Sequence, residues 1–142
     1  MEHLPEFVAN HLLLVCLFIG LLSLLIWNLF GNSISGIQEI TPAEATRMMN
    51  HEKAVVLDLR ADEDFSAGHI LNSVNLPSAS IDDDAEIQNK YADKPVILTC
   101  ARGVESVRTA RVMKMKGLKK IFCLKGGIEA WRSANLPLVK QS

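Results

Sequence analysis

The chain has 142 residues, of which 22% are charged, and a formal net charge of -1 at pH 7. Its length fits a single domain, and its three cysteines include neither a Cys-x-x-Cys pair nor a Cys/His cluster with metal-ligand spacing. The composition therefore argues against a disulfide-rich secreted protein and against a metal site, and we expect no metal.

Residues 12–30 are the first predicted element. This run of 19 residues contains no charged side chain, and as a helix it would be about 28 Å long, close to the hydrocarbon thickness of a bilayer. A buried core helix of this length would show a polar face, and this run shows none. Trp27 and Phe30 lie near its end, where interfacial aromatic residues are common.

A cleaved signal peptide is the alternative interpretation of this run, and Ser33-Ile34-Ser35 resembles the small residues of a cleavage site. Signal peptides begin with a basic segment, however, whereas the N-terminal tail contains Glu2 and Glu6 and no Lys or Arg. We therefore expect a short N-terminal tail at 1–11, a transmembrane helix at 12–30, a linker at 31–36 and a folded domain at 37–142.

The C-terminal half of the folded domain is rich in positive charge. From residue 96 to residue 142 the chain has ten Lys or Arg and only two acidic residues, Glu105 and Glu129. This half should carry a positive field that suits small anions or an anionic membrane surface. Aromatic residues are scarce and no recognition motif accompanies the charge, so we expect no nucleic-acid partner.

Short apolar runs alternate with helical segments after residue 40. Thr41-Pro42-Ala43-Glu44 has the pattern of a capping box and opens a helix. Gly68 and Gly117 are placed to end the second and fourth helices, and acidic residues 82–84 would begin the third. We expect helices at 41–50, 62–67, 81–91, 106–116 and 128–134, and strands at 54–58, 73–76, 95–99 and 120–124. This alternation predicts an α/β fold with a mostly parallel sheet covered by helices on both faces.

Cys100 directly follows the strongest predicted strand. In open parallel sheets, ligands bind beyond the carboxyl ends of the strands, where loops lead into helices. A thiolate in that position would face backbone N–H groups and the positive end of a helix, and both stabilise negative charge. Gly103 would let the loop close without a Cβ in the way. Cys100 is therefore a candidate nucleophile that could hold a persulfide, the alternative being a buried structural cysteine.

Three motifs, in the expected order, resemble those of the rhodanese family. The first consists of Asp58-Leu59-Arg60, Asp64-Phe65, Gly68-His69-Ile70 and Asn75-Leu76-Pro77. The second is the loop from Cys100 to Ser106, and the third is Leu124-Lys125-Gly126-Gly127-Ile128 with Trp131 and Leu136-Pro137. The resemblance covers about residues 37–139. With the apolar run in front, the whole chain resembles the membrane-anchored rhodanese-like proteins of bacteria.

This resemblance implies a rhodanese-like central parallel sheet with helices on both faces. It also implies sulfurtransferase chemistry through a cysteine persulfide, with no bound cofactor. The sulfur donor would be a small anion or a persulfide, and the acceptor would be cyanide or a thiol, which could belong to a protein. The catalytic residue would be Cys100, and the substrate-binding loop would be formed by Ala101, Arg102, Gly103, Val104, Glu105 and Ser106.

Other residues of these motifs are expected to be structural. Asp58, Arg60 and Asp64 should form an ion-pair or hydrogen-bond cluster that ties a strand end to the following turn. His69 should be a packed loop residue rather than a base, because persulfide transfer needs no proton shuttle there. Cys123 lies inside a predicted strand and should be an inert core residue.

Two departures from the family pattern bear on activity. Many active rhodaneses place Arg or Lys at the fifth position after the cysteine, where this chain has Glu105. Asn72-Ser73 replaces the Gly-Ala pair that usually follows Gly-His-Ile. The first departure places a carboxylate where an anionic donor would arrive, so we expect weak turnover of thiosulfate, while the fold should be unaffected.

These observations favour a sulfurtransferase or sulfur-relay protein. The alternative is a weakly active rhodanese-like module for interactions at a membrane, favoured by Glu105 and by the tether. A phosphatase or arsenate reductase is a third interpretation, disfavoured because Ser106 stands where their phosphate-binding loop requires an arginine. Since every Lys and Arg follows the apolar run, beginning with Arg47, we expect a single-pass protein of the bacterial inner membrane with its domain in the cytoplasm.

Overall fold

A computed structural model of the chain describes residues 3–30, 36–81 and 85–141. Most of the predicted linker and the predicted acidic turn at 82–84 therefore lie outside the described residues. The chain divides into two compact units, Met1–Ser35 and Gly36–Ser142.

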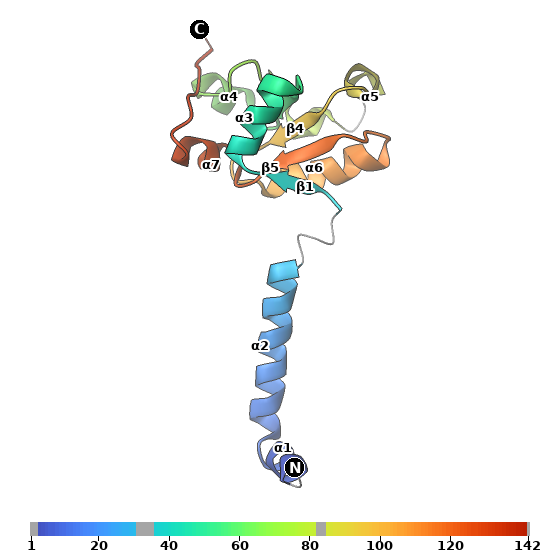
Figure 1. Ribbon diagram of the computed structural model, residues 1–142, viewed down its shortest axis with the longest axis vertical. Coiled ribbons are helices and arrows are strands. Elements are labelled where there is room, and N and C mark those ends of the chain that lie inside the picture. The colour runs from blue at the N-terminus through green and yellow to red at the C-terminus, as the bar shows by residue number, and fades with distance from the viewer. Residues whose placement is uncertain (1–2, 31–35, 82–84, 142) are drawn as a thin grey trace. The chain divides into compact units, whose positions relative to one another are not determined.

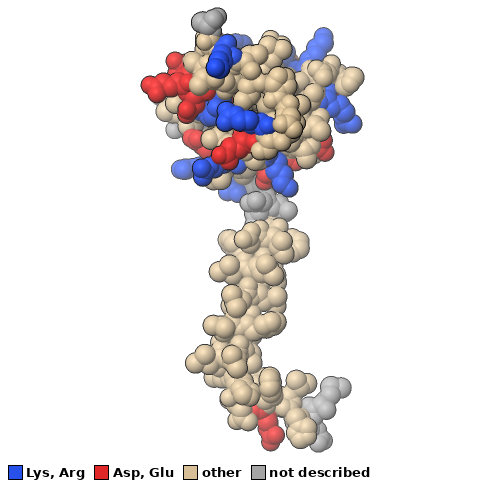
Figure 2. All heavy atoms as spheres, turned by 90° about the vertical axis from the view of Figure 1, so that its left-hand side faces the viewer, with Lys and Arg blue, Asp and Glu red and all other residues tan. Residues whose placement is uncertain are grey.

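The N-terminal unit contains two helices, α1 (Leu4–Asn10) and α2 (Leu12–Phe30). Figure 2 shows no Lys, Arg, Asp or Glu along α2, and none of its residues is buried. The bounds of α2 coincide with the predicted run, and the helix is long and apolar enough to cross a membrane. Helix α1 lies in the tail, where we predicted no element.

The second unit is built around a parallel sheet of five strands in the order β1-β5-β4-β2-β3 (Figure 1). Every neighbouring pair in this order is parallel. The central strand, β4, is buried along its whole length, as its apolar run predicted. The strands are β1 (Gln38–Ile40), β2 (Val55–Asp58), β3 (Val74–Asn75), β4 (Val96–Thr99) and β5 (Ile121–Leu124).

Helices cover both faces of this sheet, as the alternating pattern predicted. One buried cluster joins Leu98 of β4 to residues of α5 (Ala85–Tyr91) and α6 (Val104–Met115). The other joins Ile97 of the same strand to residues of α3 (Pro42–His51) and α7 (Gly127–Ser133). Neighbouring residues of β4 thus point into opposite cores, because successive side chains of a strand alternate between faces.

Most local signals act as the sequence indicates. Thr41 caps α3 with the complete capping box: its side chain accepts a hydrogen bond from the Glu44 N–H, and Glu44 binds the Thr41 N–H in return. Helix α4 (Asp62–Ala67) follows β2 and ends at Gly68. A short 3-10 turn, η2 (Ser78–Ser80), lies between β3 and α5.

Two predicted boundaries differ from the structure, and one strand was missed. Helix α6 begins at Val104, two residues earlier than predicted, because Gly103 takes a left-handed conformation and turns the chain directly into the helix. Ile81, where the helix predicted at 81–91 would begin, instead follows the 3-10 turn η2, and the described part of that helix is Ala85–Tyr91. Strand β1 was missed because its three residues include two polar ones, and it is held by pairing with β5.

Candidate active site

Cys100 lies at the carboxyl end of the central strand, between β4 and α6, as the sequence predicted. The residue is only 3% exposed. Its Sγ atom accepts a hydrogen bond from the backbone N–H of Gly103, with an N–S distance of 3.0 Å. The loop therefore bends back over the sulfur and directs a backbone dipole at it, an arrangement that stabilises negative charge there.

The first turn of α7 donates hydrogen bonds to the backbone of this loop. The N–H of Ile128 donates to the Cys100 carbonyl at 2.9 Å, and the N–H of Glu129 donates to the Ala101 carbonyl at 3.1 Å. These two N–H groups belong to the first turn of α7, where helix donors have no partner inside the helix. The two carbonyls of the loop are thus turned toward α7.

Two glycines make this contact possible. Gly127 has a φ of +60°, and a Cβ at this position would collide with the Cys100 carbonyl oxygen and lie 2.8 Å from the Ala101 carbonyl carbon. Gly103 has a φ of +93°, and its Cβ would lie 3.0 Å from the Gly126 nitrogen. Glycine is needed at both positions for the backbone conformation and for the close approach of the two loops. Gly126-Gly127 belongs to the third sequence motif, which does not indicate that the pair contacts the cysteine loop.

Ser106 and Cys123 are buried below the loop. The Ser106 hydroxyl is fully buried and donates to the Gly103 carbonyl at 3.1 Å, so it fixes the first turn of α6 to the loop. Burial raises the pKa of the Cys123 thiol to about 12, and a hydrogen bond with Ser106 offsets only part of that increase. Cys123 is therefore a neutral thiol at neutral pH, in agreement with the expected core residue.

Glu105 lies in the first turn of α6 and is exposed. Its Oε1 accepts a hydrogen bond from the Ser78 hydroxyl at 2.5 Å, so the carboxylate is held toward the 3-10 turn η2. Both residues line a pocket of about 310 Å³ together with Arg108. Cys100 is not among the residues that line this pocket, and Glu105 is the only residue of the cysteine loop that lines it. Ser78 was not singled out by the sequence motifs.

Besides Glu105, the exposed residues of the loop are Ala101, Arg102 and Val104. Val104 is an apolar side chain with 81% of its surface exposed. The Arg102 Nε atom lies 3.6 Å from Glu129 Oε1, and both side chains are largely exposed. An exposed ion pair of this kind adds little stability, so Arg102 can turn toward an incoming anion at little cost.

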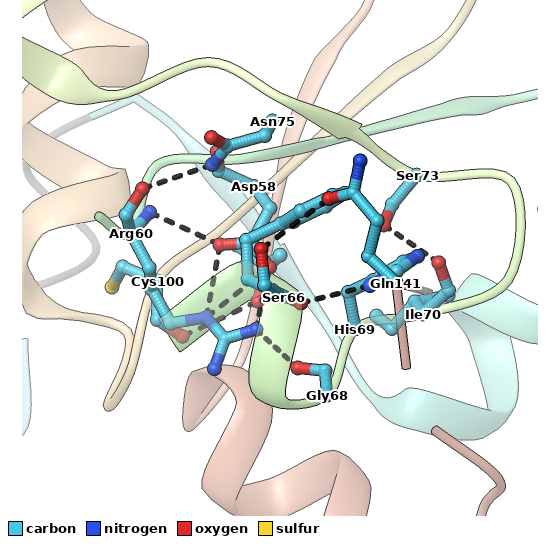
Figure 3. Close-up of polar contacts among 12 residues, drawn as sticks. Asp58, Arg60, Ser66, Gly68, His69, Ile70, Ser73, Asn75, Cys100 and Gln141 are labelled. Carbon is cyan, nitrogen blue, oxygen red and sulfur yellow. Dashed lines mark hydrogen bonds and ion pairs between the residues drawn. The ribbon is translucent and has the colours of Figure 1, made fainter. Parts of the chain in front are cut away.

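A buried ion pair braces the neighbouring strand end (Figure 3). The Arg60 guanidinium donates to both carboxylate oxygens of Asp58 and to the Gly68 carbonyl. The Asp58 side chain is fully buried, and that of Arg60 is 9% exposed. Asn75 donates to the carbonyls of both residues. Since Asp58 pairs with Thr99, this cluster lies at the same edge of the sheet as Cys100 and fixes the turn beside it.

Asp64 does not belong to this cluster. It is exposed in the first turn of α4, and within the described residues no hydrogen bond or ion pair joins it to Asp58 or Arg60. The helix start turns its side chain to solvent, so this part of the expected cluster is wrong. Its position in the first turn still suits a carboxylate, because the amino end of a helix is positive.

His69 is a packed loop residue, as expected. Its Nδ1 atom lies 2.8 Å from the Phe65 carbonyl oxygen, and its ring stacks on the Phe65 ring with 3.9 Å between centroids. Its backbone N–H and carbonyl both pair with Val139. The residue therefore ties the C-terminal segment to the turn after α4. Across the described part of the chain, no group of three His, Cys, Asp or Glu side chains could hold a metal ion.

Comparison with known proteins agrees with this geometry. Residues 41–134 match the Rhodanese-like domain family, which is well over half of the chain. The chain belongs to the rhodanese family. The match spans the buried ion pair, the Cys100 loop and the glycine pair at the start of α7.

Individual relatives cover different parts of the chain. It is 38% identical to the uncharacterized protein YibN of Escherichia coli strain K12 over 99% of both chains. It is 35% identical to the thiosulfate sulfurtransferase GlpE of Glaesserella parasuis, over 70% of this chain and 91% of that protein. The crystal structure of a rhodanese-related protein from Thermoplasma volcanium matches with a TM-score of 0.66 and 27% identity, over 73% of this chain and 99% of that one.

Proposed function

We propose that this rhodanese-like domain is a sulfurtransferase that carries sulfane sulfur as a persulfide on Cys100. The observation that best supports the proposal is the hydrogen bond from the Gly103 N–H to the Cys100 sulfur, in a loop at the carboxyl edge of a parallel sheet. The thiosulfate sulfurtransferase name of the GlpE relatives agrees with this chemistry.

The proposed reaction has two steps. The Cys100 thiol first loses its proton to solvent, and the thiolate attacks the outer sulfur of the donor. A bond forms between the two sulfurs and the donor's own sulfur bond breaks, so thiosulfate would leave as sulfite with the bonding electron pair. In the second step an acceptor thiolate or cyanide attacks the terminal sulfur of the persulfide. The electron pair of the sulfur–sulfur bond then returns to Cys100 as a thiolate.

The thiolate and the persulfide of Cys100 both need hydrogen-bond donors that stabilise negative charge. The negative charge lies on Sγ before the transfer and on the terminal sulfur after it, so donors arranged around the loop can serve both states. The contacts of α7 hold the carbonyls of Cys100 and Ala101 away from the sulfur. Ala101, Arg102, Gly103, Val104, Glu105 and Ser106 would then form the substrate-binding loop, with the Arg102 guanidinium available to an anionic donor.

The test is sulfur transfer by the full chain in detergent micelles. Thiocyanate formation from thiosulfate and cyanide is measured for the wild type, for Cys100→Ser and for Cys123→Ser. The proposal expects that only Cys100→Ser abolishes transfer, because Cys123 is a buried neutral thiol. Transfer that survives in Cys100→Ser and is lost in Cys123→Ser would show that Cys123 carries the sulfur and that the assignment to Cys100 is wrong.

A second candidate function is an interaction module with little turnover. Glu105 supports it, because its exposed carboxylate lies in the first turn of α6, next to the cysteine loop, and would oppose anionic donors. This candidate predicts at most traces of thiocyanate from the wild type and no accumulation of a persulfide on Cys100 after incubation with a sulfur donor. Detection of the Cys100 persulfide by mass spectrometry therefore separates the two functions.

We also propose that α2 anchors the protein in the bacterial inner membrane, with the domain in the cytoplasm. The length and apolar character of α2 support the span. The orientation follows from the distribution of Lys and Arg, all of which come after α2 in the chain. A reporter enzyme that works only in the periplasm, fused after Ser142, should be inactive in this orientation. Activity of the reporter would show that the domain lies in the periplasm instead.

A further inference from the structure

We propose that the end of the domain where the chain enters from α2 docks on anionic lipid headgroups. This entry surface consists of Met115 and the surrounding lysines Lys114, Lys116, Lys119 and Lys120. The proposal rests on the anchoring role of α2, and it is independent of sulfur transfer at Cys100.

The position of this surface is fixed by contacts inside the domain. Helix α6 returns antiparallel to the strands, so it ends at the edge of the sheet where the strands begin (Figure 1). The Lys114 Nζ atom donates to the Gly36 carbonyl at 2.7 Å. Gly36 is the first described residue after α2, and it leads directly into β1. The end of α6 thus borders the point at which the chain enters the domain.

The charge of the entry surface has one sign. Its four lysines are exposed and lie within seven residues, and no Asp or Glu occurs between Glu105 and Glu129. The turns before β2 and β4 reach the same edge, but they carry Glu52-Lys53 and Asp93-Lys94, whose charges cancel. A basic cluster next to a membrane anchor is attracted to the negative surface potential of an anionic leaflet.

Met115 adds an apolar contact at the centre of this charge. Its side chain is 81% exposed, although methionine is usually buried. An apolar side chain flanked by lysines suits the boundary between headgroups and acyl chains, where each lysine can keep its ammonium group in the polar layer.

Chain length brings this surface within reach of a membrane. Five residues, 31–35, separate Phe30 from Gly36, and even a fully extended segment of that length spans only about 20 Å. With α2 across the bilayer, Gly36 stays within that distance of the membrane interface. Cys100 lies at the opposite edge of the sheet, after the end of β4. Docking through the entry surface would therefore leave the cysteine loop facing away from the lipid, open to a soluble partner.

The test uses the full chain reconstituted into vesicles of phosphatidylcholine with or without phosphatidylglycerol. An environment-sensitive fluorophore is attached to Met115→Cys in a background of Cys16→Ser, Cys100→Ser and Cys123→Ala. Val104→Cys in the same background is the matched control, because Val104 is also 81% exposed but lies in the cysteine loop. We expect a blue shift at position 115 in anionic vesicles only, a smaller shift at high salt, and no shift at position 104.

Charge-reversal variants then test the lysines. Lys119→Glu with Lys120→Glu should abolish the shift, whereas Arg132→Glu with Lys140→Glu, an equal change of charge on other exposed residues, should leave it intact. Equal shifts at positions 115 and 104, or equal shifts in neutral and anionic vesicles, would overturn the proposal. So would a shift that requires an added soluble protein instead of anionic lipid. Extraction of the chain from vesicles by alkaline carbonate would show instead that α2 is not a span.

Discussion

Replacement of Gly127 by alanine adds only one methyl group, but it should strongly disrupt the cysteine loop. Its φ of +60° costs an L-residue about 1–2 kcal/mol. The new Cβ would also collide with the Cys100 carbonyl, so the hydrogen bonds from Ile128 and Glu129 to the loop would be broken or stretched. At about 1 kcal/mol for each bond, we expect a total destabilisation of about 3–4 kcal/mol.

Gly117→Ala is the matched control for this prediction. Gly117 has a φ of +115°, and nothing lies within 4 Å of its added Cβ, so the substitution introduces only backbone strain of about 1–3 kcal/mol. Urea unfolding in micelles can be followed by fluorescence of the buried Trp131 in a Trp27→Phe background. Persulfide loading of both variants is then compared without urea. Equal stability and equal loading of the two variants would refute the proposed contact between the glycine pair and the loop.

Three further predictions concern charge at the site. Glu105→Arg should raise kcat/KM for thiosulfate by about tenfold at low ionic strength and by less at high salt, because it replaces a repulsive charge with an attractive one. The gain should be smaller for methanethiosulfonate, which carries one negative charge instead of two, and equal gains would exclude charge selection by this residue. At pH 7, alkylation of the native protein should modify Cys100 before Cys123, whose thiol is buried and neutral, and the reverse order would contradict the assignment. Burial raises the pKa of Cys123 from 9.0 to about 12, so its contribution to stability is complete below pH 9 and is lost as the pH rises toward 12. By pH 10 the wild type should lose about 1 kcal/mol relative to Cys123→Ala in urea unfolding, and parallel pH profiles would argue against this burial.

The sequence predicted the parts of the fold that depend on local signals. The capping box at Thr41 and the apolar run of β4 form the expected helix and strand, because side-chain capping and strand burial are encoded over a few neighbouring residues. Strand β1 escaped prediction because it gains its hydrogen bonds from β5, more than eighty residues later in the chain. Pairing over such a separation leaves no periodic pattern in a three-residue segment.

In the candidate site, too, local features could be predicted and long-range contacts could not. The position of Cys100 at the end of β4 could be predicted, because the strand and the following glycine are local features. The contact of Gly127 with the loop could not be predicted from spacing, because it depends on how α7 packs against the end of the sheet. Asp64 illustrates the opposite error, a contact that was predicted and is not formed. Its place in the family motif suggested a contact with Asp58 and Arg60, but at the start of α4 its side chain is exposed to solvent.

The central claim is that Cys100 carries the transferred sulfur, and intact-mass spectrometry tests it most directly. The full chain is incubated with thiosulfate or methanethiosulfonate, freed of donor, and measured before and after addition of a thiol acceptor. The proposal predicts a gain of one sulfur atom, which maps to the peptide that contains Cys100, is absent from Cys100→Ser, and disappears when the acceptor is added. An unchanged mass with both donors, or an added sulfur that maps to Cys123, would contradict it.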